Sequence, residues 1–196
     1  MSDYYEPHAR LRLGKTVVLG GQIGCGAAAI GRNVAARIGL SFSEVDRLIE
    51  HEAGMSLAKL AFEDGFDRIG LRAESALARL VGRPPHGLVV LDRAWPPATA
   101  REILAREALF VRIDRPEDYL ARRWAVKLER SGDWVLGGTS LRLPIEDARD
   151  LQPFFEGREP LLREAQIVLE AGDQHANRVA DLLLESFEQI SGAETP

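Results

Sequence analysis

The residues best placed to do chemistry lie in a glycine-rich loop close to the start of the chain. The segment from Gly21 to Ala28 has the glycine spacing of a phosphate-binding loop, G-x-x-x-x-G-K-[S/T]. It follows an apolar run at 16–19 and opens a run of helical character, which is the context that this motif requires. Backbone N–H groups in such a loop hold phosphate or another anion. The residues predicted to form this anion-binding cradle are Gly21, Gly24, Cys25, Gly26, Ala27 and Ala28.

The two side chains that give a phosphate-binding loop its chemistry are missing. Ala27 stands at the position of the motif's lysine, and Ala28 at the position of the hydroxyl that binds Mg²⁺. A methyl group neither neutralises a phosphate nor ligates a metal, whereas phosphoryl transfer depends mostly on positioning and charge neutralisation. We therefore expect a loop that holds an anion but barely transfers it, and that does not bind Mg²⁺ tightly.

Two further residues have alternative interpretations. Cys25 lies at a helix N-terminus, where the pKa of a thiol can fall, but we favour a simpler role in filling a small space between glycines. Asp92 ends the apolar run at 88–91, and open α/β sheets place functional groups at the ends of their strands. Asp92 is therefore either an acidic residue of a nucleotide site, similar to a Walker B acid, or an ordinary cap.

The composition narrows the class of protein. The chain has 196 residues and a formal net charge of −5, which argues against a nucleic-acid-binding surface because such surfaces are usually basic. We expect neither a membrane span, since no apolar run approaches about 20 residues, nor a signal peptide. No pair of histidines has metal-ligand spacing, so no metal site is predicted. A single cysteine fits a reducing compartment, and we expect a cytoplasmic protein of bacterial type.

Alternating patterns of strands and helices predict the fold. Residues 1–14 are polar and irregular, and we interpret them as a flexible N-terminal arm before a single domain over 15–192. Short apolar runs predict strands near 16–20, 41–45, 88–91, 109–113 and 167–169. Helical periodicity predicts helices over 28–38, 46–53, 56–63, 67–81, 96–106, 116–129, 145–165 and 176–190. Strands separated by helices indicate an α/β fold with a parallel sheet that is covered on both faces.

The loop is part of a longer pattern in the N-terminal half, and a second, short pattern runs from Gly157 through Arg158 to Ala165. The first pattern consists of Gly24, Gly26, Ile30, Gly31, Arg32, Ala35, Ile38, Gly39, Leu40, Phe42, Asp46, Ile49, Glu50, Ala53, Gly54, Met55, Ser56, Leu57, Phe62, Glu63 and Gly65. In these residues the chain resembles the shikimate kinase family over about 15–190. The resemblance implies a fold similar to P-loop nucleotide kinases, with three layers, α/β/α, around a five-stranded parallel sheet.

The resemblance also implies roles for residues outside the loop. Asp46 matches a carboxylate that accepts hydrogen bonds from substrate hydroxyls, and Arg158 matches a substrate-binding arginine. Glu44 stands at the first acidic position of the family's Asp-x-Asp, from which it could hold a metal through water. Two alternatives stay open at this point: Asp46 could cap its own helix, and Arg158 could pair on the surface with Glu159 or Asp150.

Three other parts of the chain depart from the family's pattern. The family's substrate-binding arginine falls at about Gly70 and is lost, and the family's glycine triplet after the third strand reads Asp92-Arg93-Ala94. The lid, at about 130–145, lacks the family's Arg-Pro-Leu-Leu. The residues that the resemblance places at an adenine or in the lid are Arg122, Arg123, Trp134 and Arg142.

Three hypotheses for function follow. We favour an impaired, non-catalytic member of this fold that binds ATP, ADP or a CoA thioester, or a partner protein, in a regulatory or accessory role. The second hypothesis is an active enzyme. It would be either an ATP-dependent small-molecule kinase such as a shikimate kinase, or a fold reused for other chemistry with Asp46, Glu44 and Asp92 as acid/base candidates. The third is a structural subunit with an empty pocket.

Overall fold

The structure is a computed structural model and describes residues 14–82, 86–120 and 152–193. Within these ranges, no helix combines the length and the apolar character that crossing a membrane requires. The predicted N-terminal arm lies almost wholly outside the described residues. The predicted lid and most of the helix expected over 116–129 also lie outside them.

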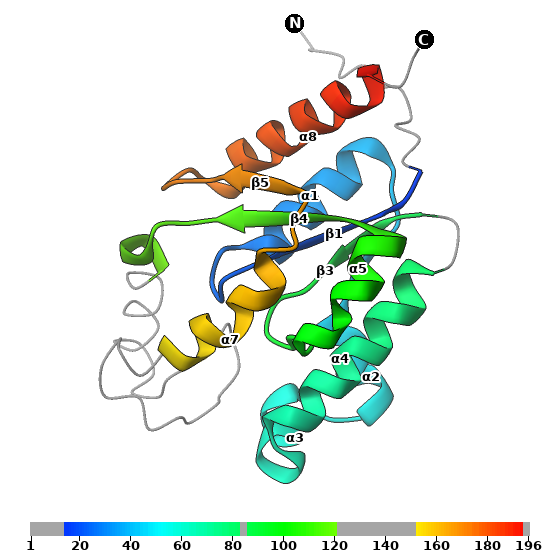
Figure 1. The fold of residues 1–196 in the computed structure, drawn as a ribbon, viewed down its shortest axis with the longest axis vertical. Coiled ribbons are helices and arrows are strands. Elements are labelled where there is room, and N and C mark those ends of the chain that lie inside the picture. Colours follow the sequence, from blue (N-terminus) through cyan, green and yellow to red (C-terminus); the bar gives the residue numbers. More distant parts are fainter. Residues whose placement is uncertain (1–13, 83–85, 121–151, 194–196) are drawn as a thin grey trace, which may run out of the picture.

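Five parallel strands form one sheet at the centre of the fold (Figure 1). The strands are β1 Thr16–Gly21, β2 Phe42–Glu44, β3 Leu88–Val90, β4 Ala108–Asp114 and β5 Ile167–Glu170. Their order across the sheet is β2-β3-β1-β4-β5, and Val18 of β1 pairs with Val89 of β3 and with Phe110 of β4. The central strands are rich in apolar residues because helices cover both of their faces. The predicted α/β fold with a five-stranded parallel sheet is confirmed.

The helices alternate with the strands along the chain. They are α1 Ala27–Ile38, α2 Val45–Ala53, α3 Leu57–Asp64, α4 Phe66–Val81, α5 Arg101–Glu107, α7 Gln152–Leu162 and α8 Ala176–Ala193. The helix expected over 96–106 begins later, with a 3₁₀ turn, η1 Ala98–Ala100, because Pro97 is extended with a ψ of 166°. Glycines in the left-handed conformation end α1 and α2, with φ angles of 69° at Gly39 and 64° at Gly54.

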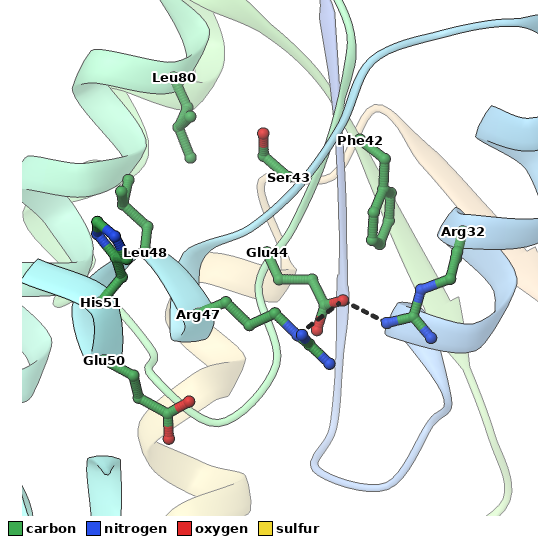
Figure 2. A pocket seen from close by; sticks show the side chains of 9 residues that line it. All are labelled: Arg32, Phe42, Ser43, Glu44, Arg47, Leu48, Glu50, His51 and Leu80. Atoms are coloured by element: carbon green, nitrogen blue, oxygen red, sulfur yellow. Dashed lines mark hydrogen bonds and ion pairs between the residues drawn. The ribbon is translucent and has the colours of Figure 1, made fainter. Parts of the chain in front are cut away.

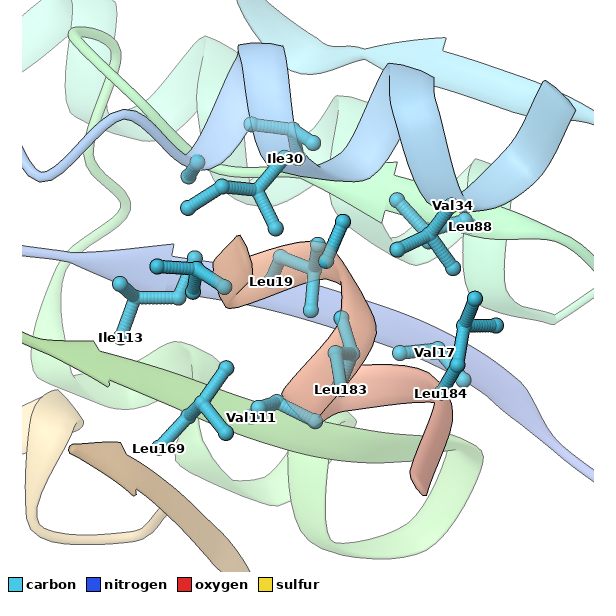
Figure 3. Close-up of a cluster of buried hydrophobic side chains, with 14 of the residues drawn as sticks. Val17, Leu19, Ile30, Val34, Leu88, Val111, Ile113, Leu169, Leu183 and Leu184 are labelled. Carbon is cyan, nitrogen blue, oxygen red and sulfur yellow. The ribbon is translucent and has the colours of Figure 1, made fainter. Parts of the chain in front are cut away.

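Two apolar clusters, one on each face, make the sheet the middle layer of three. On one face α1 and α8 cover the sheet (Figure 1), and Leu19, Ile30 and Leu183 pack together between these helices and the sheet (Figure 3). On the other face α2, α3, α4, α5 and α7 cover a second cluster that includes Val18 and Phe110. Each such side chain contributes about 1.5–3 kcal/mol when it is fully buried. These clusters therefore stabilise the fold and hold the carboxyl ends of the strands in place.

Gly31 on α1 provides a test of how tightly the first of these faces packs. A Cβ at Gly31 would lie 2.8 Å from Cδ2 of Leu88 and 3.0 Å from Cγ2 of Val90. We expect Gly31→Val to lower the free energy of unfolding by about 1–3 kcal/mol, because it overpacks this interface. A Cβ at Gly157 on α7 would meet no atom within 4 Å. Gly157→Ala should therefore raise the free energy of unfolding by about 0.5–1 kcal/mol. Urea unfolding measures both changes, and a neutral Gly31→Val would contradict the close packing.

Candidate functional site

The loop between β1 and α1 depends on glycines at defined positions. Gly24 and Gly26 have positive φ angles of 88° and 89°, a conformation that residues with side chains rarely adopt. A Cβ at Gly21 would lie 2.6 Å from the carbonyl oxygen of Ile113 and 2.7 Å from Sγ of Cys25. The glycines therefore allow a tight turn at the carboxyl end of β1, which is where open parallel sheets bind ligands.

The first turn of α1 presents an uncapped positive end next to this turn. The helix begins at Ala27 with Gly26 as its N-cap, no side chain caps it, and its first turn contains no acidic residue. The N–H groups of a first helical turn have no partners within the helix, and the helix dipole favours a negative charge there. The side chain of Ala27 is fully buried among apolar residues. The position of the motif's lysine thus carries a buried methyl group.

Arg115 fixes the base of the loop from behind. It follows β4 and is buried. It donates to the carbonyl oxygen of Cys25 at 3.3 Å and to those of Ala171, Gly172 and Gln174 at 3.0, 2.7 and 2.7 Å. Its donors therefore hold the backbone of the loop against the segment after β5, and they do not face a ligand.

A second polar link joins the loop to α7. Nε2 of Gln22 donates to the carbonyl oxygen of Phe155 at 3.2 Å and to Oε1 of Glu159 at 3.0 Å. The other oxygen of Glu159 accepts a hydrogen bond from Nη1 of Arg112 on β4 at 3.4 Å. Arg112 also pairs with Asp114 at 2.7 Å. Two carboxylates thus balance the charge of Arg112.

Asp46 holds the segment that follows β3. It lies in the first turn of α2, is 3% exposed, and is not the N-cap of that helix, a position that Glu44 occupies. Its Oδ2 accepts hydrogen bonds from the backbone N–H and from Nε of Arg93 at 3.1 and 2.7 Å. Its Oδ1 accepts one from the backbone N–H of Ala94 at 2.9 Å. The alternative in which Asp46 caps its own helix is therefore wrong, because its carboxylate is turned toward another segment.

Arg158 is buried at the same edge of the sheet, against Trp95. Its Nη1 donates to the carbonyl oxygen of Gly21 at 3.0 Å and its Nη2 to that of Arg93 at 3.3 Å. Its guanidinium carbon lies 4.6 Å from the centre of the Trp95 ring, a cation–π contact. Burial lowers the pKa of Arg158 to about 10, and nearby Asp92 opposes this effect, so the side chain stays charged at neutral pH. The alternative of a surface ion pair is wrong, because Arg158 is 3% exposed.

Asp92 adds a carboxylate to the centre of this site. Burial, and after it the charge of Asp46, raise the pKa of Asp92 from 3.8 to about 6, while Arg158 and Arg93 oppose the increase. Burial, and after it the charge of Asp92, raise the pKa of the Cys25 thiol to about 12. Asp92 is therefore close enough to the loop to place a negative charge beside it at neutral pH. The thiol stays protonated, as expected for a residue that fills space.

Glu44 faces a different part of the surface. Its carboxylate pairs with Arg32 and lies 3.5 Å from Nε of Arg47, in an open groove beside the outer strand β2 (Figure 2). The groove has a volume of about 740 Å³, and Phe42 and His51 are among the residues that line it. In the part of the chain that the structure describes, no group of three or more His, Cys, Asp or Glu side chains is arranged to hold a metal ion.

The structure thus brings Asp46, Asp92 and Arg158 together beside the loop and leaves Glu44 at the edge of the sheet. The residues predicted at an adenine or in the lid lie outside the described ranges, namely Arg122, Arg123, Trp134 and Arg142.

Comparison with known proteins assigns the family. The family model described as shikimate kinase matches residues 23–188. The chain belongs to the shikimate kinase family. The shikimate kinase of Caulobacter vibrioides is 31% identical over 182 residues, which cover 89% of this chain and 83% of that protein. The shikimate kinase of Paramagnetospirillum magneticum is also 31% identical, over 83% of this chain and 79% of that protein.

Solved structures of shikimate kinases share the fold. The shikimate kinase from Acinetobacter baumannii in complex with shikimate superposes with a TM-score of 0.73, covers 95% of this chain and 98% of that one, and is 22% identical. The enzyme from Bacteroides thetaiotaomicron gives a TM-score of 0.66 at 20% identity and covers 89% of this chain and 99% of that one. At these identities the likeness shows the common α/β fold alone.

The sequence alone does not identify two arginines that shape the site, Arg93 and Arg115. The sequence pattern marks Arg93 only as part of an altered glycine triplet, and it does not mark Arg115 at all. Each lies within three residues of the end of a strand, β3 or β4, at the carboxyl edge of the sheet. That position is the signal that could have found them, because functional groups of open parallel sheets gather there.

The buried position of Cys25 can be tested with a thiol reagent. We expect no reaction in the folded protein at a pH of about 8, because the thiolate is the reactive form and the pKa of Cys25 is about 12. The chain has one cysteine, so labelling reports this residue alone. The denatured protein serves as the control and should react completely. Rapid labelling of the folded protein would contradict the burial of this side chain.

Asp92 should make the stability of the protein depend on pH. The pKa of Asp92 is higher in the folded state than in the unfolded state. The contribution of Asp92 to stability is therefore fully present below a pH of about 3.8 and is lost as the pH rises through about 6. From pH 4 to pH 7, the free energy of unfolding of the wild type should fall relative to that of Asp92→Asn by on the order of 1–2 kcal/mol. Denaturant unfolding at the two pH values measures this change. A difference between the proteins that is independent of pH would contradict the raised pKa.

Proposed function

We propose that this member of the shikimate kinase family binds a phosphate-bearing ligand at the loop between β1 and α1, and transfers its phosphoryl group slowly or not at all. The ligand is of the nucleotide or CoA-thioester class, and the role of binding is regulatory or accessory. The observation that carries the proposal is the buried methyl group of Ala27 at the first position of α1, where a kinase loop has its lysine.

Retained binding is supported by the backbone of the loop. Gly24 and Gly26 turn the chain with positive φ angles, and α1 begins without a side-chain cap. Both features hold an anion through backbone N–H groups and the helix dipole, so neither depends on the missing side chains. A nucleotide and a CoA thioester share the pyrophosphate that such a loop recognises.

Loss of transfer is supported by the charges around the loop. In the described part of the chain, Arg112, Arg115 and Arg158 surround the loop, but their donors are engaged by internal carboxylates and carbonyl oxygens. Asp92 adds a negative charge near Cys25 of the loop and no positive one. Removing one preorganised donor typically slows a reaction by about 10²–10³-fold. Loss of both the lysine and the hydroxyl then implies a reduction on the order of 10⁴–10⁶-fold if the two act independently.

The names of the relatives favour a second candidate function, ATP-dependent phosphorylation of a small alcohol such as shikimate. Such an activity would require a cation from residues outside the described ranges, for example Arg122 or Arg123. A coupled assay of ADP formation from ATP in the presence of shikimate separates the two functions. The first proposal predicts a rate far below the roughly 1–100 s⁻¹ of kinases.

Restoring the missing groups tests the proposal directly. We expect Ala27→Lys combined with Ala28→Ser to tighten the binding of ATP with Mg²⁺ at least about tenfold, because a charged hydrogen bond to phosphate contributes about 1.5–3 kcal/mol. Ala29→Lys is a matched control, since it adds the same charge at an exposed position of the same helix turn. The control should change the affinity by less than about threefold, because an exposed charge is screened. Calorimetric titration measures both affinities.

Two outcomes would contradict the proposed function. If the wild type binds none of pyrophosphate, ADP, ATP and CoA at millimolar concentration, the loop does not hold an anion. If the wild type phosphorylates shikimate at the rate of an ordinary kinase, the loop lysine is not needed and the second candidate function is correct.

A further inference from the structure

The carboxylate that the family resemblance assigns to substrate hydroxyls already accepts three hydrogen bonds from the chain itself. Asp46 accepts hydrogen bonds from Nε of Arg93 at 2.7 Å and from the backbone N–H groups of Arg93 and Ala94 at 3.1 and 2.9 Å. The side chain of Asp46 is 4% exposed and that of Arg93 is 18% exposed. Arg93 and burial therefore leave little of this carboxylate within reach of a substrate hydroxyl.

Arg93 lies between two carboxylates of α2. Besides its bond to Asp46, its Nη2 lies 3.5 Å from Oε1 of Glu50. Glu50 follows Asp46 by four residues, so the two side chains lie on one face of the helix. The same Oε1 accepts a hydrogen bond from the backbone N–H of Leu57 at 3.0 Å, which holds it in place. A planar guanidinium with donors in a fixed fork suits such a pair of carboxylates.

Trp95 covers the arginine that the resemblance assigns to the substrate. The guanidinium of Arg158 stacks on the Trp95 ring, and its donors go to the backbone carbonyl oxygens of Gly21 and Arg93. A Cβ at Gly20 would lie 3.1 Å from Cη2 of Trp95, so the indole lies directly against the end of β1. Both Nη groups of the buried Arg158 are therefore already bound by backbone carbonyl oxygens, at the edge where a substrate carboxylate would bind.

Gly70 on α4 lies against the segment that follows β3. A Cβ at Gly70 would lie 3.3 Å from the carbonyl oxygen of Trp95 and 3.8 Å from Cδ of Pro97. Position 70 therefore lies in tight contact with the segment after β3. The two places where the sequence departs from the family's pattern, position 70 and residues 92–94, thus meet in the same segment.

We propose that residues 92–95 are an internal occupant of the acceptor pocket. The guanidinium of Arg93 takes the place of substrate hydroxyls at Asp46. The carbonyl oxygen of Arg93, together with that of Gly21, takes the place of a substrate carboxylate at Arg158, and Trp95 covers the face of that guanidinium. Arg93 is thereby a specificity-determining residue that excludes hydroxylated carboxylic acids such as shikimate. This inference goes beyond the proposed function, because it concerns the acceptor pocket and not the phosphate-binding loop.

Removal of the Arg93 side chain tests the proposal. Arg93→Ala leaves Asp46 and Glu50 facing a space shaped for a guanidinium group. We expect methylguanidinium to bind this variant saturably at millimolar concentration and to raise its melting temperature, with no such effect on the wild type. Arg79→Ala is the matched control, since it removes an arginine that pairs with Glu52 at 2.8 and 2.9 Å on the surface. Methylammonium at equal concentration controls for ionic strength.

A titration of the wild type with shikimate tests the proposal without any variant. We expect no saturable binding at shikimate concentrations up to about 10 mM. This range is wide enough, because dissociation constants near about 1 mM are readily measured. Saturable binding of shikimate to the wild type would overturn the proposal. An equal response of the wild type, Arg79→Ala and Arg93→Ala to methylguanidinium would overturn it as well. Failure of the wild type to bind pyrophosphate would count against the proposed function alone, because it concerns the loop.

Discussion

The pairing of buried charges at the carboxyl edge of the sheet is the constraint on which the site depends. Asp46 and Arg158 are each 3% exposed. Each ion that is moved from water into a protein interior loses several kcal/mol of hydration, so it needs partners with good geometry. Both find their partners in the segment after β3, through the side chain, N–H and carbonyl group of Arg93. One short segment therefore connects β1, α2 and α7.

Groups of the chain itself occupy both sides of the site. On the loop side, the buried methyl group of Ala27 and the charge of Asp92 lie beside the start of α1. On the other side, the donors of Arg93 and Arg158 are bound to Asp46 and to backbone carbonyl oxygens. The two apolar clusters cover the faces of the sheet and extend to the site, since Cys25 and Ala27 belong to the first cluster and Ala94 belongs to the second. The residues that stabilise the fold and those that shape the site therefore meet at the carboxyl edge of the sheet.

Local patterns in the sequence predict most of the fold. The apolar runs around Val18, Val89 and Phe110 identify the central strands, and Gly39 and Gly54 end their helices where the pattern places them. The site is less accessible to such reasoning, because its contacts join residues far apart in the chain. Asp46 and Arg93 are separated by 47 residues, and no local periodicity links them. A glycine loop can be found from spacing alone, whereas a buried ion pair requires the topology of the sheet.

The interlocked segment after β3 has a consequence for substitutions. Glycine at position 93 would leave Asp46 as a buried carboxylate without its guanidinium, a loss of about 3–5 kcal/mol for a broken buried pair. A Cβ at position 70 would lie 3.3 Å from the carbonyl oxygen of Trp95, in tight contact with the same segment. Changes at positions 70 and 93 therefore fall on one structural unit, so their effects on stability are coupled rather than additive.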